Sequence, residues 1–210
     1  MDSTVVVALI GFGGVCVSTV GGMFVQHMLH KKKDKDKNTW RDVIPVMHKV
    51  YGCLNSIINN CGAIRASIFY TENGGGVPTA KSDLFCTMSY EVCQNTRSLR
   101  NEYQRRPVDQ AYTYMLQSLL TSQTGCIRIQ TANMAPCDLK TIYEENGTTQ
   151  SLVFVLLRSI DKFHYCSFNF DFEGEIPEEI VNRCFLEASA IRDLFHQSEP
   201  KRKAINLWLF

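Results

Sequence analysis

Residues 62–75 read GAIRASIFYTENGG, and this stretch decides the fold. Gly62 is a residue type that ends helices, because glycine adopts a left-handed backbone conformation without a steric cost. Residues 63–70 read as a β-strand, rich in apolar and aromatic side chains. Residues 72–78 contain three consecutive glycines and a proline, a composition that is typical of a turn or loop. The stretch therefore predicts the end of a helix, one strand and a glycine-rich loop.

The segment before this strand has the pattern of an amphipathic helix. Between Asn38 and Cys61, apolar residues recur at helical spacing. Pro45 lies in the first turns, where a helix tolerates proline best. The apolar positions are Val43, Ile44, Val46, Met47, Val50, Tyr51, Leu54, Ile57 and Ile58.

The rest of the chain alternates between strand and helix patterns. Further strands are predicted at residues 84–92, 125–129, 151–157 and 165–172, with a turn at residues 161–162. Further helices are predicted from Pro107 onward, over residues 138–145, and from about Pro177 to His196. The order is helix, two strands, helix, strand, short helix, two strands, helix. This order is typical of an α+β domain with one mainly antiparallel sheet and helices against it.

The arrangement resembles the GAF family of small-molecule-binding sensor domains and, more distantly, PAS domains, over about residues 42–197. Residues 62–69 look like the family's "gA-x-R-x-x-I-f" entry into its first strand. Residues 70–75 are similar to the "HNGG" turn of a GAF-like subgroup found behind membrane helices in bacterial and phage proteins, with Glu72 where that subgroup commonly has histidine. The hairpin over residues 152–172 and the helix after it match the end of the fold. Neither the tetrapyrrole-attachment cysteine nor the cyclic-nucleotide motif is present.

The resemblance implies a ligand cavity between the sheet and the segment of about residues 84–146. Such a pocket needs apolar walls and a few convergent polar groups. For each candidate, the alternative role is that of a surface or turn residue. The candidate ligand-binding residues are Glu72, Asn73, Tyr90, Arg97 and Arg128.

The N-terminus predicts a single membrane anchor over residues 1–30. No Asp, Glu, Lys or Arg occurs between Asp2 and Lys31, which is long enough for a helix to cross the hydrocarbon core. A buried helix of a soluble domain would show a polar face. A cleaved signal peptide would begin with basic residues and end at a small-x-small site, and this segment does neither.

A basic linker follows the predicted anchor, over residues 31–41. Positive residues beside a membrane helix mark the cytoplasmic side, so we expect the domain of residues 42–198 to lie in the cytoplasm. The lysines can also contact anionic lipid headgroups, which makes membrane lipid an expected partner. The lysines of this cluster are Lys31, Lys32, Lys33, Lys35 and Lys37.

Small residues recur every four positions in the predicted anchor, at Gly14, Ser18 and Gly22. This spacing lets two membrane helices approach closely, and it predicts a homodimer through this helix face.

Composition and motifs argue against several function classes. The near balance of 22 basic and 21 acidic residues argues against a protein that coats nucleic acid. Tyr103 lies inside a basic segment that could stack on single-stranded nucleic acid, but a solvated face is the favoured reading. The segment's arginines are Arg97, Arg100, Arg105 and Arg106.

No residue pattern predicts catalysis or a metal site. The nine cysteines contain no CxxC pair, and the five histidines are dispersed without an HExxH or HxH pair. The cysteines are expected to be mostly reduced and structural, as in the cytosol. The sequence names no cofactor.

The C-terminal tail, residues 199–210, joins three basic residues to an apolar end with Trp208 and Phe210. Such an end is costly to leave in water. Three docking sites stay open: its own domain, a partner, or the bilayer interface.

Two function classes remain. The first is a membrane-anchored, non-catalytic GAF-like sensor that binds a small molecule or a protein partner at the cytoplasmic face. The second is a structural or interaction protein, phage-encoded and of a holin-like or membrane-remodelling kind, with the fold used as a scaffold.

Overall fold

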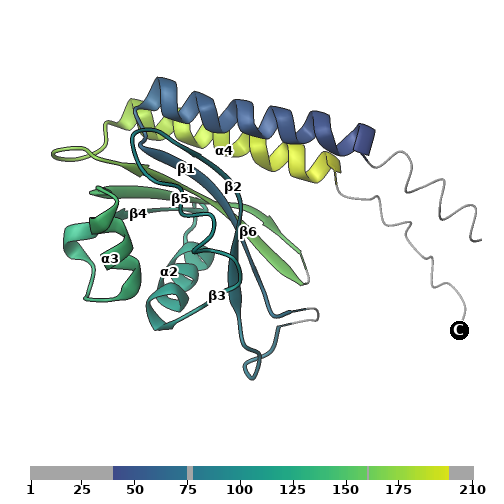
Figure 1. The fold of residues 1–210 in the computed structure, drawn as a ribbon, viewed down its shortest axis with the longest axis horizontal. Helices are drawn as coiled ribbons and strands as arrows, with labels where there is room; N and C mark the ends of the chain where they lie inside the picture. Colours follow the sequence, from purple (N-terminus) through teal and green to yellow (C-terminus); the bar gives the residue numbers. More distant parts are fainter. Residues whose placement is uncertain (1–39, 75–77, 160, 199–210) are drawn as a thin grey trace, which may run out of the picture. The chain divides into compact units, whose positions relative to one another are not determined.

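A computed structural model describes residues 40–74, 78–159 and 161–198 of the chain (Figure 1). The chain divides into two units between Pro45 and Val46. Residues 40–61 are helical, and this first helix belongs to the second unit from residue 46 onward. Residues 40 and 41, which the sequence assigned to the basic linker, are therefore already helical.

The predicted anchor, its Gly14–Ser18–Gly22 face, the lysine cluster and the tail with Trp208 and Phe210 all lie outside the described residues. Within those residues, no helix has both the length and the apolar composition that crossing a membrane requires.

The second unit is built on one sheet of six strands in the order β3-β2-β1-β6-β5-β4. All neighbouring strands pair antiparallel, which confirms the predicted α+β class. The strands are β1 (Arg65–Glu72), β2 (Phe85–Cys93), β3 (Arg106–Pro107), β4 (Cys126–Gln130), β5 (Gln150–Arg158) and β6 (Lys162–Phe170).

Helices cover both faces of this sheet, and each face has its own hydrophobic core (Figure 1). The first helix and α4 (Glu178–Ser198) cover one face, where Leu54, Ile68 and Phe168 are fully buried. Helices α2 (Gln110–Thr121) and α3 (Asp138–Glu145) lie on the other face, together with a short 3₁₀ helix, η1 (Thr131–Asn133).

Strand β1 contributes to both cores because successive side chains of a strand point to opposite faces. Ala66 and Ile68 pack in the core beneath the first helix and α4. Phe69 packs in the core beneath α2, on the face that Arg65 and Ser67 share. The alternation fixes the register, since a slip by one residue would move Arg65 into the apolar core.

The helix end predicted at Gly62 is confirmed. The first helix ends at residue 61, and Gly62 has a φ of 72°, in the region that favours glycine. Ile64 then donates its backbone N–H to the carbonyl of Asn169 at 2.8 Å, which begins the pairing of β1 with β6.

Several predicted boundaries were wrong. Strand β1 continues to Glu72, and β6 begins at Lys162, where a turn was expected. These two residues are cross-strand partners, and Lys162 Nζ lies 3.4 Å from Glu72 Oε2, so the ion pair extends the pairing of β1 with β6. Strand β6 also ends at Phe170, two residues earlier than predicted.

The second helix begins at Gln110 and not at Pro107. Pro107 pairs with Phe85 in β3, an edge strand, where a missing N–H is tolerated. Asp109 caps the helix, because its Oδ1 accepts a hydrogen bond of 2.8 Å from the backbone N–H of Tyr112.

Asp109→Ala is expected to lower the free energy of unfolding by about 1 kcal/mol, because it removes this cap. Urea denaturation followed by circular dichroism measures the change. Asp83→Ala is the matched control, since Asp83 is exposed and lies before β2. An equal effect of the two substitutions would show that the cap contributes nothing.

The eight cysteines of the described residues are free thiols. Burial raises the pKa of the Cys86 thiol to about 12, so this group stays protonated at neutral pH and packs as a small apolar side chain.

Candidate functional site

A buried arginine, Arg65, is the most unusual polar group in the structure. It lies on β1 and is 1% exposed, the largest of the fully buried side chains. Arginine is almost never buried to this degree unless it is paired, because removing the charge from water is costly. The contacts of Arg65 therefore define the candidate site.

Glu91 on β2 neutralises this charge. Arg65 Nε lies 3.0 Å from Glu91 Oε1, and the two side chains are 2% and 4% exposed. Ser67 is the cross-strand partner of Glu91, so Arg65 and Glu91 lie diagonally on the same face of the sheet. Glu91 also accepts hydrogen bonds from the backbone N–H of Leu99, at 3.0 Å, and from the hydroxyl of Ser98.

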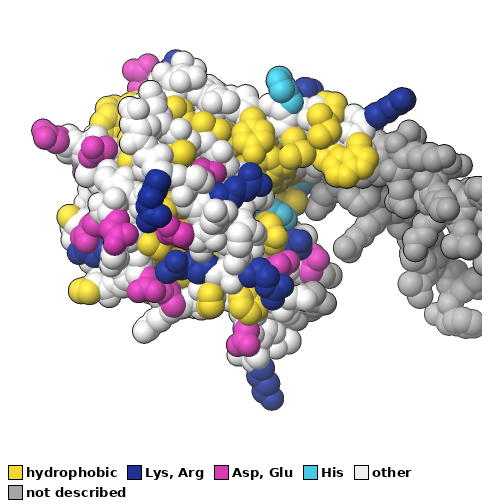
Figure 2. Space-filling view, in the orientation of Figure 1, with side chains coloured by type: hydrophobic (Ala, Val, Ile, Leu, Met, Phe, Trp, Pro, Cys, Tyr) yellow, Lys and Arg dark blue, Asp and Glu magenta, His cyan; other side chains and the backbone are white. Residues whose placement is uncertain are grey.

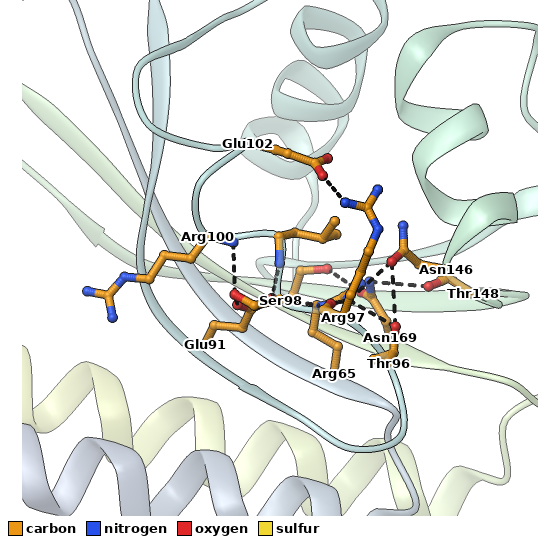
Figure 3. Close-up of polar contacts among 12 residues, drawn as sticks. Arg65, Glu91, Thr96, Arg97, Ser98, Arg100, Glu102, Asn146, Thr148 and Asn169 are labelled. Carbon is orange, nitrogen blue, oxygen red and sulfur yellow. Dashed lines mark hydrogen bonds and ion pairs between the residues drawn. The ribbon is translucent and has the colours of Figure 1, made fainter.

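The guanidinium also holds the loop of residues 94–105, here called the covering loop. Arg65 Nη2 donates to the carbonyl of Arg97 at 2.5 Å and to Thr96 Oγ1 at 3.2 Å. Figure 3 shows Glu91 and Ser98 on one side of Arg65 and Asn146, Thr148 and Asn169 on the other. One side chain therefore ties the centre of the sheet to the loop above it.

Asn146 connects the same guanidinium to α3. It is the C-terminal cap of that helix, and its Nδ2 donates to the carbonyl of Ile142 at 2.8 Å. Its Oδ1 lies 3.5 Å from Arg65 Nη2 and from Thr96 Oγ1. The sheet, the covering loop and α3 therefore converge at one buried polar junction.

Two buried polar atoms beside this junction have no hydrogen-bond partner within the described part of the chain: Arg65 Nη1 and Ser67 Oγ. Their residues line a buried cavity of about 20 Å³. A cavity holds a water molecule when its volume exceeds roughly 10–15 Å³ on this measure, so the present cavity is about one water in size. An unmet donor on a buried cation is costly, so this cavity favours a polar occupant such as a water molecule.

Four tyrosines line the cavity: Tyr103, Tyr112, Tyr143 and Tyr165. Burial raises the pKa of each of these phenols, so all four stay protonated at neutral pH and can donate hydrogen bonds. Tyr165 Oη lies 3.0 Å from Cys86 Sγ, and its ring stacks on Phe69 with 5.2 Å between the ring centroids.

Ser167 and Asn169 also line the cavity, and both contact the hydroxyl of Ser151. Ser151 Oγ and Ser167 Oγ are 2.8 Å apart, and each lies 2.9 Å from Asn169 Oδ1. The cavity therefore has one cation, already paired, and several neutral donors. Its other walls are apolar, with Met88, Leu99 and Met115. The arrangement suits a small neutral molecule that carries hydrogen-bond acceptors.

None of the five residues predicted to bind a ligand lines this cavity. Glu72 pairs with Lys162, and Arg128 on β4 pairs with Glu178 at 2.6 Å. Asn73 directly follows β1. Tyr90 lies on the other face of the sheet, where its ring centroid is 5.3 Å from that of Tyr51. Their role in binding stays a prediction.

Arg97 is the predicted residue that comes nearest to the site, through its backbone carbonyl. Its side chain is 57% exposed and pairs with Glu102, with Glu145 3.9 Å away. In Figure 3 it extends from the covering loop toward Glu102, away from Glu91.

Two of the four arginines in the basic segment, Arg97 and Arg106, pair with carboxylates. Arg106 Nη2 lies 3.3 Å from Asp138 Oδ2, and the guanidinium of Arg105 lies 4.7 Å from the centroid of the Phe85 ring. Figure 2 shows basic and acidic side chains interspersed over this face of the molecule, without a continuous basic stripe. Within the described ranges, no group of three or more potential metal ligands occurs.

Only the comparison with solved structures identifies similar proteins, and those structures agree on the fold. No family model matches the sequence, and no curated protein matches it. The structure is similar to a far-red cyanobacteriochrome photoreceptor, with a TM-score of 0.57 and 12% identity over 83% of this chain and 99% of that one. The fold is GAF-like.

Two further solved structures support this assignment. The phycoerythrobilin-bound GAF domain of a cyanobacterial phytochrome has a TM-score of 0.52 at 12% identity, over 77% of this chain and 95% of that one. The GAF domain/HD domain protein of Geobacter sulfurreducens has a TM-score of 0.52 at 6% identity, over 73% and 93%. At these identities the likeness concerns the fold of the GAF-like domain and not its ligand.

Proposed function

We propose that this chain is a membrane-anchored, non-catalytic sensor whose GAF-like domain binds a small polar molecule at the cytoplasmic face of the membrane. The observation that carries the proposal is the buried cavity into which Arg65 Nη1 and Ser67 Oγ present unmatched polar atoms. The uncharged segment between Asp2 and Lys31, followed by lysines, supports the anchor and its orientation.

The bound molecule is expected to be neutral and to carry hydrogen-bond acceptors. Glu91 already compensates the charge of Arg65 at 3.0 Å, so an added anion would leave a net negative charge buried. The unmatched groups that remain for the ligand are Arg65 Nη1 and the hydroxyl of Ser67. The phenols of Tyr112 and Tyr143, which burial keeps protonated, could also donate to it after exchanging their present partners.

Binding requires the covering loop to move. A cavity of about 20 Å³ admits nothing much larger than water, whereas pockets for organic ligands measure roughly 300–1,000 Å³. Leu99 and Tyr103, both in the covering loop, form part of its wall. Displacing their side chains would enlarge the cavity, while moving the loop backbone would also break its hydrogen bonds to the sheet, such as that from the backbone N–H of Met88 to the carbonyl of Tyr103 at 2.8 Å. A conformational change of this loop is also a means by which binding could be signalled.

Thermal unfolding of the full chain in lipid nanodiscs, with a library of neutral polar metabolites, tests the proposal. A ligand at 100 times its dissociation constant stabilises a protein by about 2.7 kcal/mol, which raises the melting temperature. Tyr112→Phe is expected to reduce this increase, because it removes one hydroxyl from the cavity. Tyr114→Phe is the matched control on the same helix, since Tyr114 is 74% exposed. Equal increases in both variants would place the ligand elsewhere.

The small size of the cavity also favours the second function, a scaffold with a filled interior. Native mass spectrometry of the full chain distinguishes the two. A co-purifying small molecule supports the sensor. Its absence, together with no thermal stabilisation and with permeabilised membranes on expression, would support a structural or membrane-remodelling protein.

A further inference from the structure

A second hollow, of about 470 Å³, lies between β5, α4 and the turn at residues 122–125. We call it the basic hollow. It shares no lining residue with the buried cavity beside Arg65. Its volume is within the range of roughly 300–1,000 Å³ that is typical of ligand sites.

The two charged side chains that line the basic hollow, Arg158 and Arg192, are both basic. Arg158, Arg192 and His196 line it, and no Asp or Glu is among its described lining residues. Neither arginine forms a salt bridge within the described ranges of the chain, whereas Arg97, Arg106 and Arg128 each pair with a carboxylate.

The two arginines also keep most of their hydrogen-bonding capacity. Arg158 Nη2 lies 3.4 Å from the carbonyl of Leu120, and Arg192 Nη2 lies 3.3 Å from Ser189 Oγ. A guanidinium has five N–H donors, arranged in a planar fork that fits phosphate and carboxylate groups. Two arginines that line one hollow without a counter-charge favour an anion.

The remaining lining of the basic hollow is part polar, from Ser122, Gln123, Thr124 and Ser189, and part apolar. Phe185 on α4 is 44% exposed, and its ring packs against that of Phe154 with 6.4 Å between the centroids. Beneath them, Leu156 on β5 and Ala188 on α4 form an apolar floor. A partly exposed aromatic ring and two arginines in the lining of one hollow suit a ligand that has both an apolar part and a charged group.

We propose that the basic hollow binds an organic anion, with its phosphate or carboxylate group between Arg158, Arg192 and His196 and its apolar part against Phe185. This site is independent of the proposed sensor cavity. The anion is either a free small molecule or the headgroup of an anionic lipid, since both present the same phosphate chemistry.

Isothermal titration calorimetry with phenyl phosphate tests the proposal, using the full chain in phosphatidylcholine nanodiscs. The double substitution Arg158→Gln with Arg192→Gln is expected to weaken binding about tenfold or more, because charge-assisted hydrogen bonds are lost. Lys49→Gln with Lys81→Gln is the matched control. It removes the same charge from two exposed positions outside the basic hollow and should leave binding unchanged.

A second variant separates the apolar contact from the charge. Phe185→Ser is expected to weaken the binding of phenyl phosphate but not that of inorganic phosphate. Circular dichroism confirms that each variant is folded. If the double arginine variant unfolds, Arg192→Gln alone provides the test at a half-buried helix position.

Three results would overturn the proposal: no binding of phenyl phosphate to the folded wild type, equal weakening by the arginine and lysine pairs, or no effect of Phe185→Ser. Nanodiscs that contain phosphatidylglycerol identify the source of the anion. Competition by this lipid indicates a headgroup, and unchanged affinity for phenyl phosphate indicates a free molecule. Both of these outcomes support an anion site.

Discussion

Replacing Glu91 by alanine is expected to lower the free energy of unfolding by about 3–5 kcal/mol, because removing one partner of a buried ion pair leaves the other charge uncompensated. Arg65 would remain buried at 1% exposure without its carboxylate. The backbone N–H of Leu99 and the hydroxyl of Ser98 would also lose their acceptor. Urea denaturation of the full chain in nanodiscs, followed by circular dichroism, measures the effect.

Two controls separate the buried charge from the loss of any ion pair. Glu102→Ala breaks the ion pair with Arg97, in which the side chain of Arg97 is 57% exposed and that of Glu102 is 33% exposed. This substitution should lower the free energy of unfolding by less than about 1 kcal/mol. Arg65→Met combined with Glu91→Leu should cost less than Glu91→Ala alone, since it leaves no unpaired charge. If Glu91→Ala and Glu102→Ala had similar effects, Arg65 would have to be solvated in solution.

Leu54→Ala is expected to lower the free energy of unfolding by about 3–5 kcal/mol. Leu54 is fully buried in the core between the first helix, α4 and the sheet. Truncation of a buried leucine loses its transfer free energy and leaves a cavity that the neighbours fill only in part. The same denaturation experiment measures this change.

This substitution tests whether the first helix belongs to the folded GAF-like domain. Asn59→Ala, at an exposed position of the same helix, should change stability by no more than about 0.5 kcal/mol. A small effect of Leu54→Ala would mean that the helix packs on the sheet weakly and serves mainly as a connection.

The sequence was sufficient to predict the fold because its signals were local. The helical spacing before Gly62, the strand pattern after it and the apolar run of β5 each lie within one segment. The boundaries that were wrong depended on partners distant in the chain. Glu72 and Lys162 extend β1 and β6 because they pair with each other. The residues next to each of them in the sequence do not predict this contact. The start of α2 was the exception, since Asp109 is a recognisable cap.

The candidate site was harder to predict because its residues converge from separate segments. Arg65 is 26 residues from Glu91 and 81 residues from Asn146 along the chain. One signal was present in the sequence: an arginine in a strand whose other residues are apolar or small. Such a residue lies either at an exposed edge or in the interior with a partner. Because β1 is a central strand of the sheet, Arg65 is buried and needs a partner. The tyrosines carried no comparable signal, since aromatic residues are ordinary core material.

The two cores of this domain, one on each face of the sheet, place different constraints on their residues. On the side of the first helix and α4, the buried residues are almost all apolar, so that side is constrained mainly by shape and volume. On the side of α2 and α3, buried phenols, hydroxyls and an ion pair must each keep a matching partner. Over evolution, the first side can exchange one apolar residue for another while the fold persists. A change of ligand on the second side requires coordinated substitutions, and the sheet confines them to that face.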